Sequence, residues 1–222
     1  MEPVHITTVY FDLGDTLGAP VLSPPPIHLI GFEVFDVAMP VLDELSDLGL
    51  RLGVISNTGD DDGGAVDAVL STAGIRDCFA PELRIYSRDV GLRKDSPAIF
   101  RLAAARAGVP AGGCLFVGEN DSERGFARQA GMAAAPHPLL ARDVAAGMPV
   151  RRIRFTATVA GWPAMVAPLR VVPLTMAGDP VVVEAMAPDA AVPALTELGF
   201  APEVLGDVPT LPVPTSEMDG VS

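Results

Sequence analysis

The sequence predicts an α/β fold: a Rossmann-like parallel sheet with helices on both faces, followed by a small C-terminal α+β unit. Short apolar stretches typical of buried strands alternate with stretches at helical spacing from residue 4 to residue 137, which is the order that a parallel sheet requires. Hydrophobic residues make up 49% of the 222 residues and aromatic residues only 5%. The core is therefore expected to be mainly aliphatic, as in sheets that helices cover.

Five segments are the expected strands of this sheet. Each is short and apolar, and most of them end in polar residues. They span residues 4–12, 50–57, 82–87 and 114–120 and the short AAAPHP stretch at 133–138.

Four segments are the expected helices, because their apolar residues recur at helical spacing. They span residues 38–49, 65–75, 96–109 and 122–132. Gly49 is placed to end the first helix, and Ser96 followed by Pro97 is placed to begin the third. The remaining segment, 19–37, contains LSPPPIH and is expected to be irregular and extended, since proline disfavours helix.

The composition changes after about residue 148, which predicts three parts: a core domain over 1–148, a small α+β unit over 151–205 and a Pro-rich tail over 206–222. In the small unit, FTATVAGW, LRVVPLTMAG and PVVVEAMA are expected strands, the last two joined by a turn at AGD. An amphipathic helix is expected over 189–200. The tail is expected to be extended or disordered.

The formal net charge of −13 argues against nucleic acid or an anionic membrane as the main partner. No stretch approaches 18 uninterrupted apolar residues, and the first residues lack the pattern of a secretion signal. We therefore expect a cytoplasmic protein. Its two cysteines and three histidines are too scattered for a ligand set, and the acidic run Asp60–Asp62 is expected to be a solvated loop.

Polar residues stand where the expected strands end. Asp12 lies in VYFDLGDTLG, Ser56 and Asn57 follow the second strand, Glu119 follows the fourth, and Lys94 precedes the third helix. Because the carboxyl ends of parallel strands meet at one edge of a sheet, we expect these residues to converge there. Lys94 is also the only lysine among 15 basic residues, and a lysine offers a compact point charge where arginine offers a wide fork.

Four of these stretches, in order over about residues 4–137, resemble the motifs of the haloacid dehalogenase superfamily of phosphatases and related hydrolases. FDLGDTL resembles the nucleophile loop of that family, and VISNTG resembles its second motif. KDSPAIF resembles the third motif, and LFVGENDSERGFARQAGM resembles the fourth.

The resemblance implies a hydrolase, most simply a phosphatase. Asp12 would attack phosphorus and form an aspartyl-phosphate, which divides one difficult displacement into two easier ones. Ser56, Asn57 and Lys94 would bind and orient the phosphoryl group, and Ser56 and Lys94 would stabilise its charge during transfer. The expected substrate is a phosphorylated small molecule or protein.

The resemblance also implies a Mg²⁺ cofactor. Asp12, the backbone carbonyl of Gly14, Glu119 and Glu123 would hold it, and oxygen atoms are the ligands that Mg²⁺ prefers.

Three positions depart from the family pattern. Gly14 stands where phosphatases of the family usually have a second Asp as general acid and base, a role worth about 10²–10⁴ in rate. Asp15 is expected to shape the loop instead, by an Asx hydrogen bond. Glu119 stands where Asp is usual. Asp95 follows Lys94 and is expected to pair with it.

No large cap domain is expected, because only about 44 residues separate Asp12 from Ser56 and about 38 separate Ser56 from Lys94. The site would then be open to a large substrate, or covered by the C-terminal unit or a partner subunit. That unit could also form a homodimer through an edge strand. Two alternatives stay open: a catalytically weak or inactive family member that acts as a scaffold or regulator, and a dehalogenase-like hydrolase that cleaves carbon–halogen bonds.

Overall fold

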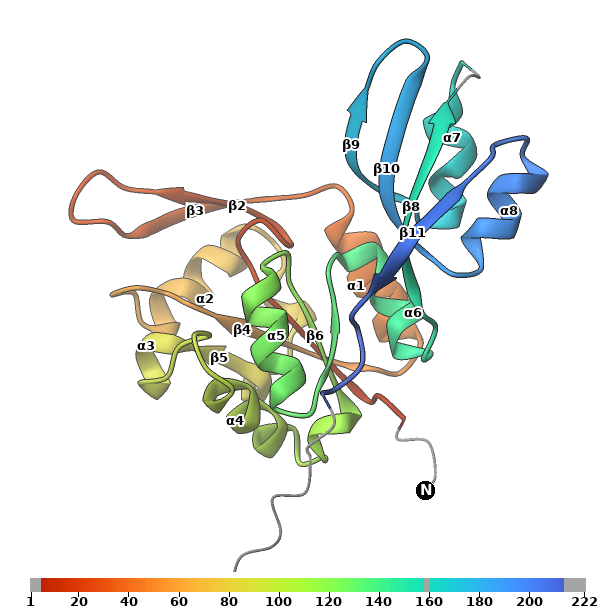
Figure 1. The fold of residues 1–222 in the computed structure, drawn as a ribbon. Helices are drawn as coiled ribbons and strands as arrows, with labels where there is room; N and C mark the ends of the chain where they lie inside the picture. Colours follow the sequence, from red (N-terminus) through yellow and green to blue (C-terminus); the bar gives the residue numbers. More distant parts are fainter. Residues whose placement is uncertain (1–4, 158–159, 214–222) are drawn as a thin grey trace, which may run out of the picture. The chain divides into compact units, whose positions relative to one another are not determined.

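The computed structural model describes residues 5–157 and 160–213, and these form two compact units (Figure 1). The first unit runs to Pro138 and is joined by residues from Leu211 onward, and the second spans Leu139–Thr210. The boundary therefore falls earlier than residue 148, because a short helix, α6 (Ala141–Ala145), belongs to the second unit. Within the described residues, no helix combines the length and apolar character needed to cross a membrane.

A five-stranded parallel sheet forms the centre of the first unit, as the sequence predicted. Its strands lie in the order β5-β4-β1-β6-β7, and every neighbouring pair is parallel. They are β1 (Thr8–Phe11), β4 (Arg51–Ser56), β5 (Arg84–Tyr86), β6 (Cys114–Val117) and β7 (Ala133–Ala135). The chain adds strands to one side of β1 and then to the other, so the carboxyl end of β1 is the point where ligands bind in such sheets.

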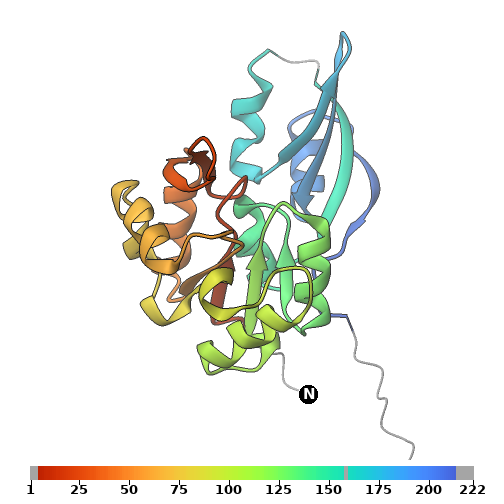
Figure 2. The same ribbon diagram turned by 90° about the vertical axis from the view of Figure 1, so that its left-hand side faces the viewer.

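Helices cover both faces of this sheet. They are α1 (Ala38–Asp47), α2 (Gly63–Thr72), the short α3 (Ser87–Val90), α4 (Ala98–Ala107) and α5 (Asp121–Gln129). The single-turn 3₁₀ helices between them are η1 (Arg76–Cys78), η2 (Pro81–Leu83) and η3 (Ala111–Gly113). Right-handed crossovers that reverse at β1 place α1 and α2 on one face and α4 and α5 on the other, and Figure 2 shows α2 and α5 on opposite sides of the strands.

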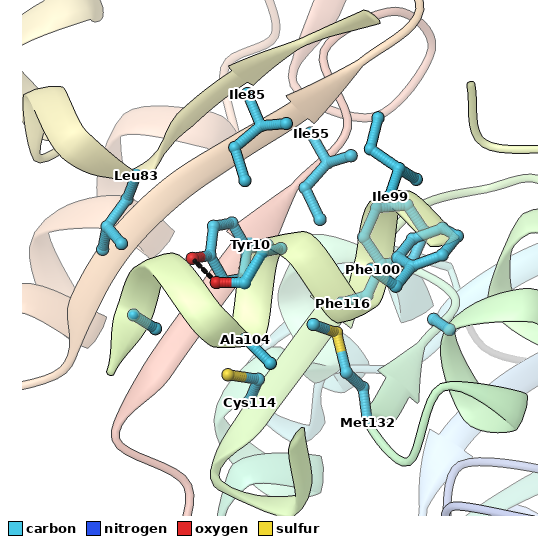
Figure 3. Packing of buried hydrophobic residues seen from close by; sticks show 13 residues of the cluster. Tyr10, Ile55, Leu83, Ile85, Ile99, Phe100, Ala104, Cys114, Phe116 and Met132 are labelled. Carbon is cyan, nitrogen blue, oxygen red and sulfur yellow. Dashed lines mark hydrogen bonds between the residues drawn. The ribbon is translucent and has the colours of Figure 1, made fainter. Parts of the chain in front are cut away.

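The core under α4 combines aromatic and aliphatic side chains (Figure 3). Tyr10 of β1 is fully buried, and its hydroxyl donates a hydrogen bond of 2.7 Å to the carbonyl oxygen of Ala103 in α4. Phe100 and Phe116 pack edge to face, with ring centroids 4.9 Å apart. These contacts fix α4, and with it the preceding segment that carries Lys94, against the sheet.

Helix ends differ slightly from the expected ones. The helix α2 begins at Gly63, before the expected residue 65, because the Asp62 carboxylate accepts a hydrogen bond from the Ala65 amide and caps it. The helix α4 begins at Ala98, so Pro97 rather than Ser96 occupies its cap position.

The expectation of an irregular segment over 19–37 is wrong. An antiparallel hairpin forms there, from β2 (Gly18–Leu22) and β3 (Leu29–Val34). The run of prolines lies in the turn, which the Ser23 hydroxyl closes by accepting from the His28 amide at 2.9 Å and donating to the Pro26 carbonyl at 2.7 Å. Proline is compatible with such a two-stranded ribbon, since both of its strands are edges.

The second unit is a small α+β unit with an antiparallel sheet. Its elements are α6, β8 (Val150–Ala157), α7 (Trp162–Val166), η5 (Ala167–Leu169), β9 (Val172–Ala177), β10 (Val181–Pro188), α8 (Ala191–Glu197) and β11 (Glu203–Val208), preceded at the boundary by η4 (Pro138–Leu140). From β8 onward the order β-α-β-β-α-β, with the sheet order β11-β8-β10-β9, is that of a ferredoxin-like fold. The strand β11 includes residues 206–208, which were expected to begin the tail.

Candidate active site

A cavity of about 510 Å³ lies at the carboxyl edge of the parallel sheet in the first unit. It brings together every site residue predicted from the sequence, namely Asp12, Gly14, Ser56, Asn57, Lys94, Glu119 and Glu123. Asp12 directly follows β1, Ser56 ends β4, and Glu119 lies just beyond β6. Parallel strands that end at one edge thus account for the convergence.

Asp12 is held rigidly and is 7% exposed. Its amide donates to the Val117 carbonyl at 2.9 Å, which ties the end of β1 to β6. Its Oδ1 atom accepts from the Leu13 amide at 2.7 Å and lies 2.6 Å from the Lys94 Nζ atom. Among the described residues none hydrogen-bonds to Oδ2, so this oxygen is the one available for attack. Burial raises the pKa of the Asp12 carboxyl, and the Lys94 charge opposes that rise.

Lys94 is the central cation of the cavity, and its side chain is 2% exposed. Its Nζ atom also lies 2.8 Å from Glu123 Oε2, an ion pair whose angle is not that of a hydrogen bond. The ammonium group lies 5.7 Å from the centroid of the Phe116 ring, within cation–π range. The Lys94 amide donates to Asn57 Oδ1 at 3.0 Å. Asn57 therefore positions the segment that carries the lysine.

Glu119 is anchored by a residue that the sequence analysis did not single out. Thr16 donates its hydroxyl to Glu119 Oε2 at 2.7 Å and accepts from the Glu119 amide at 3.3 Å. A second unpredicted residue, Arg124, donates to the carbonyls of Gly118 and Glu119 at 2.7 and 2.5 Å. The only signal in the sequence was their place inside the first and fourth motifs, and the contacts themselves depend on the fold.

Glu123 lies in the first turn of α5, where Asn120 caps the helix by accepting from the amides of Ser122 and Glu123 at 3.0 and 3.2 Å. Burial raises the pKa of the Glu123 carboxyl, and the Lys94 charge again opposes that rise. The side chain is 15% exposed, so the carboxylate lies at the inner wall of the cavity.

The fit to a metal ion is one of donor chemistry. Asp12, Glu119, Glu123 and the backbone of Gly14 offer oxygen atoms to one cavity, and these suit Mg²⁺. Among the described residues, however, no three His, Cys, Asp or Glu side chains are already assembled around a common point. Magnesium binding at these residues stays a prediction.

The loop after Asp12 differs from the expectation for Asp15. Its backbone is left-handed, with φ of 56°, and its amide donates to the Gly18 carbonyl at 2.9 Å. The Asp15 carboxylate makes no hydrogen bond within the described residues, so the expected Asx contact is wrong, and Asp15 lines the cavity instead. A Cβ atom at Gly14 would meet only Pro20, at 3.7 Å, which is an ordinary contact.

The expectation that Asp95 pairs with Lys94 is also wrong. The Asp95 side chain is 72% exposed, and the cation nearest to it is Arg93, 3.9 Å away. Lys94 points inward from the same segment, so its charge serves the cavity alone.

The acidic run Asp60–Asp62 is more than a solvated loop. Asp61 Oδ1 lies 2.7 Å from His28 Nδ1, and Asp61 Oδ2 accepts from the Leu29 amide at 2.7 Å. These bonds hold the pKa of the Asp61 carboxyl below its usual value, with the amide of Leu29 as the main cause. Asp61 therefore fastens the β2–β3 hairpin to the loop that follows β4.

The fold and the cavity together define an α/β hydrolase-type site with a carboxylate at the topological switch point of a parallel sheet. The family model of the haloacid dehalogenase-like hydrolases matches residues 6–131, more than half of the chain, and the protein belongs to that family. A comparison with curated proteins finds no match.

Solved structures show the same fold. An uncharacterised protein from Listeria monocytogenes serotype 4b is 23% identical with a TM-score of 0.51, over 58% of this chain and 76% of that one. A HAD phosphatase from Thermococcus onnurineus is 29% identical with a TM-score of 0.41, over 46% of each chain. The 2-haloacid dehalogenase from Pseudomonas syringae pv. Tomato DC3000 is 22% identical with a TM-score of 0.46, over 58% and 85%.

Proposed function

We propose that this hydrolase is a Mg²⁺-dependent phosphatase that acts through an aspartyl-phosphate on Asp12. The observation that carries the proposal is the placement of Asp12: its Oδ1 atom is fixed by Leu13 and Lys94, and its Oδ2 atom is left for attack. A nucleophile held in this way needs no reorientation before reaction.

The chemistry requires two displacements. In the first, Asp12 Oδ2 forms a bond to phosphorus while the ester P–O bond breaks, and the leaving alkoxide takes a proton from water because Gly14 offers none. In the second, water attacks the same phosphorus, the bond to Asp12 breaks, and phosphate leaves. Lys94 and Ser56, on the floor of the cavity, stabilise the charge on the phosphoryl oxygens in both steps.

Electrostatics favours metal dependence over a metal-free reaction. Of the described residues that line the cavity, six are acidic and one, Lys94, is basic. The acidic ones are Asp12, Asp15, Asp60, Asp61, Glu119 and Glu123. An anionic substrate therefore needs additional positive charge, and bound Mg²⁺ would supply it by neutralising phosphoryl oxygens. The same charge balance disfavours a metal-free dehalogenase, whose 2-haloacid substrate is an anion.

The test is phosphate release from a broad panel of phosphate esters, with and without Mg²⁺, by the wild type and by Asp12→Asn. We expect turnover that EDTA removes and that the variant lacks. Turnover by neither protein on any ester would instead favour a binding or regulatory role. Halide release from 2-haloacids without metal would favour the dehalogenase.

A further inference from the structure

The cavity has two chemically different sides. Its floor consists of the charged and polar residues at the strand ends, whereas a wall of apolar side chains comes from the β2–β3 hairpin. That apolar wall, as we name it below, is formed by Leu22, Ile27, Leu29 and Phe32. Leu22 and Ile27 are 53% and 54% exposed, so large apolar surfaces face a cavity open to solvent, where they cost free energy unless a ligand covers them.

The apolar wall is held in place. Asp61 bonds to both His28 and the Leu29 amide, so the turn of the hairpin is fixed beside the cavity. The other side of the hairpin lies along α2 (Figure 1). A preformed apolar surface favours binding because little conformational entropy is lost when a ligand packs on it.

The charges of the cavity restrict the ligand further. Six carboxylates surround one ammonium group, so a bound divalent cation would still leave an excess of negative charge. A ligand with anionic groups beyond its phosphate would be repelled, since like charges brought together at a binding site cost several kcal/mol.

Taken together, the geometry points to the substrate class, which we infer to be phosphate monoesters whose organic group is apolar and uncharged. The phosphate lies on the floor at Asp12 and Lys94, and the organic group packs on the apolar wall. This inference rests on the proposed phosphatase function. It separates the substrate class from nucleotides, sugar bisphosphates and other ligands that carry further anionic groups.

The experiment compares three esters whose leaving groups are all primary alcohols of similar pKa: ethyl phosphate, n-hexyl phosphate and the hexyl ester that carries a terminal carboxylate. The catalytic efficiency, kcat/KM, is measured with Mg²⁺ for each. We expect n-hexyl phosphate to exceed ethyl phosphate by at least about tenfold, which is the low end of what an apolar pocket contributes. The terminal carboxylate should remove that gain.

Two matched variants locate the effect. Ile27→Ser changes the apolar wall, whereas Ile30→Ser changes a residue of the same hairpin, 59% exposed, that lines a separate groove against α2. We expect Ile27→Ser to lower kcat/KM for n-hexyl phosphate about tenfold with little change for ethyl phosphate. Ile30→Ser should leave both values unchanged.

The outcomes separate this inference from the function on which it rests. If no ester gives phosphate release that depends on Asp12, the phosphatase proposal fails, and the substrate class fails with it. If release depends on Asp12 but n-hexyl and ethyl phosphate are equal, or Ile27→Ser and Ile30→Ser behave alike, the phosphatase stands and the inference about the apolar wall is overturned.

Discussion

The ammonium nitrogen of Lys94 lies 2.6 Å from Asp12 Oδ1 and 2.8 Å from Glu123 Oε2, so one cation is shared by two carboxylates. All three side chains are at most 15% exposed, and solvent therefore screens their interaction only weakly. The lysine aligns the proposed nucleophile and also lowers the cost of placing two acids in one cavity.

Replacing Lys94 by Met keeps the length of the side chain and removes its charge. We expect phosphatase activity to be lost and the free energy of unfolding to fall by about 3 kcal/mol, because the two carboxylates keep no cation. Urea unfolding in EDTA measures this change. The control is Arg93→Met, since Arg93 is 65% exposed and its removal should change stability by at most about 0.5 kcal/mol. Equal stability of the two variants would contradict the role given to Lys94.

Asp12→Asn tests the electrostatic cost of the nucleophile. Burial raises the pKa of Asp12 in the fold, and a carboxyl with a raised folded-state pKa destabilises the fold once the pH exceeds its unfolded value. The variant lacks this cost, so without metal at pH 7.5 its melting temperature should be about 2 °C higher than that of the wild type. As the pH falls toward 4, the difference should shrink.

Added Mg²⁺ should reverse that order. A ligand that binds only the folded state stabilises it by mass action, and the wild type offers one more anionic ligand than Asp12→Asn does. Millimolar Mg²⁺ is therefore expected to raise the melting temperature of the wild type more. An equal response of both proteins would show that Asp12 is not a metal ligand.

The parts of the fold that the sequence predicted depend on local patterns. Strands such as β1 and β4 are apolar runs with a polar end, and the side-chain types at those ends indicated Asp12 and Ser56 directly. The parallel order of the sheet then brought them together without any knowledge of tertiary contacts.

The parts that the sequence did not predict depend on contacts between distant segments. Three consecutive prolines, Pro24–Pro26, suggested an irregular chain, but they are confined to a turn that Ser23 and Asp61 hold in place. The hydrogen bond between Thr16 and Glu119 spans 103 residues. In the second unit, β8 pairs with both β10 and β11, and no local signal encodes that pairing.

Exchanging Gly14 and Asp15 tests whether the enzyme lacks a general acid. The double variant Gly14→Asp/Asp15→Gly places a carboxylate where the loop has room for it, beside Pro20. It also puts glycine at the left-handed position, which glycine adopts without strain. We expect turnover of alkyl phosphates to rise by about 10², the low end for a positioned acid and base.

The matched control is Asp15→Gly alone, which should leave turnover unchanged. If this single variant lowers turnover tenfold or more, Asp15 itself transfers the proton, and the loop achieves with its third residue what other family members achieve with the second.

The two thiols should react very differently. Cys114 is fully buried in β6, and burial raises the pKa of its thiol to about 11, so about 0.1% of it is thiolate at pH 8. Cys78 is partly exposed. We expect one equivalent of Ellman's reagent to react with the native protein at pH 8, and a second only in denaturant. Cys78→Ser should remove the fast thiol, and two fast thiols in the wild type would show that the sheet opens readily.

The attachment of the hairpin by Asp61 gives the last prediction. Asp61→Ala removes the acceptor of both the Leu29 amide and His28, whereas Asp60→Ala removes the same charge from an exposed neighbour that also lines the cavity. We expect hydrogen exchange at the amides of β3 to become about tenfold faster in Asp61→Ala, since a lost acceptor costs about 1–3 kcal/mol. Asp60→Ala should leave that exchange unchanged. If both variants raise KM for an apolar ester equally while exchange stays slow, Asp61 acts through its charge, and the apolar wall is held by its packing on α2 instead.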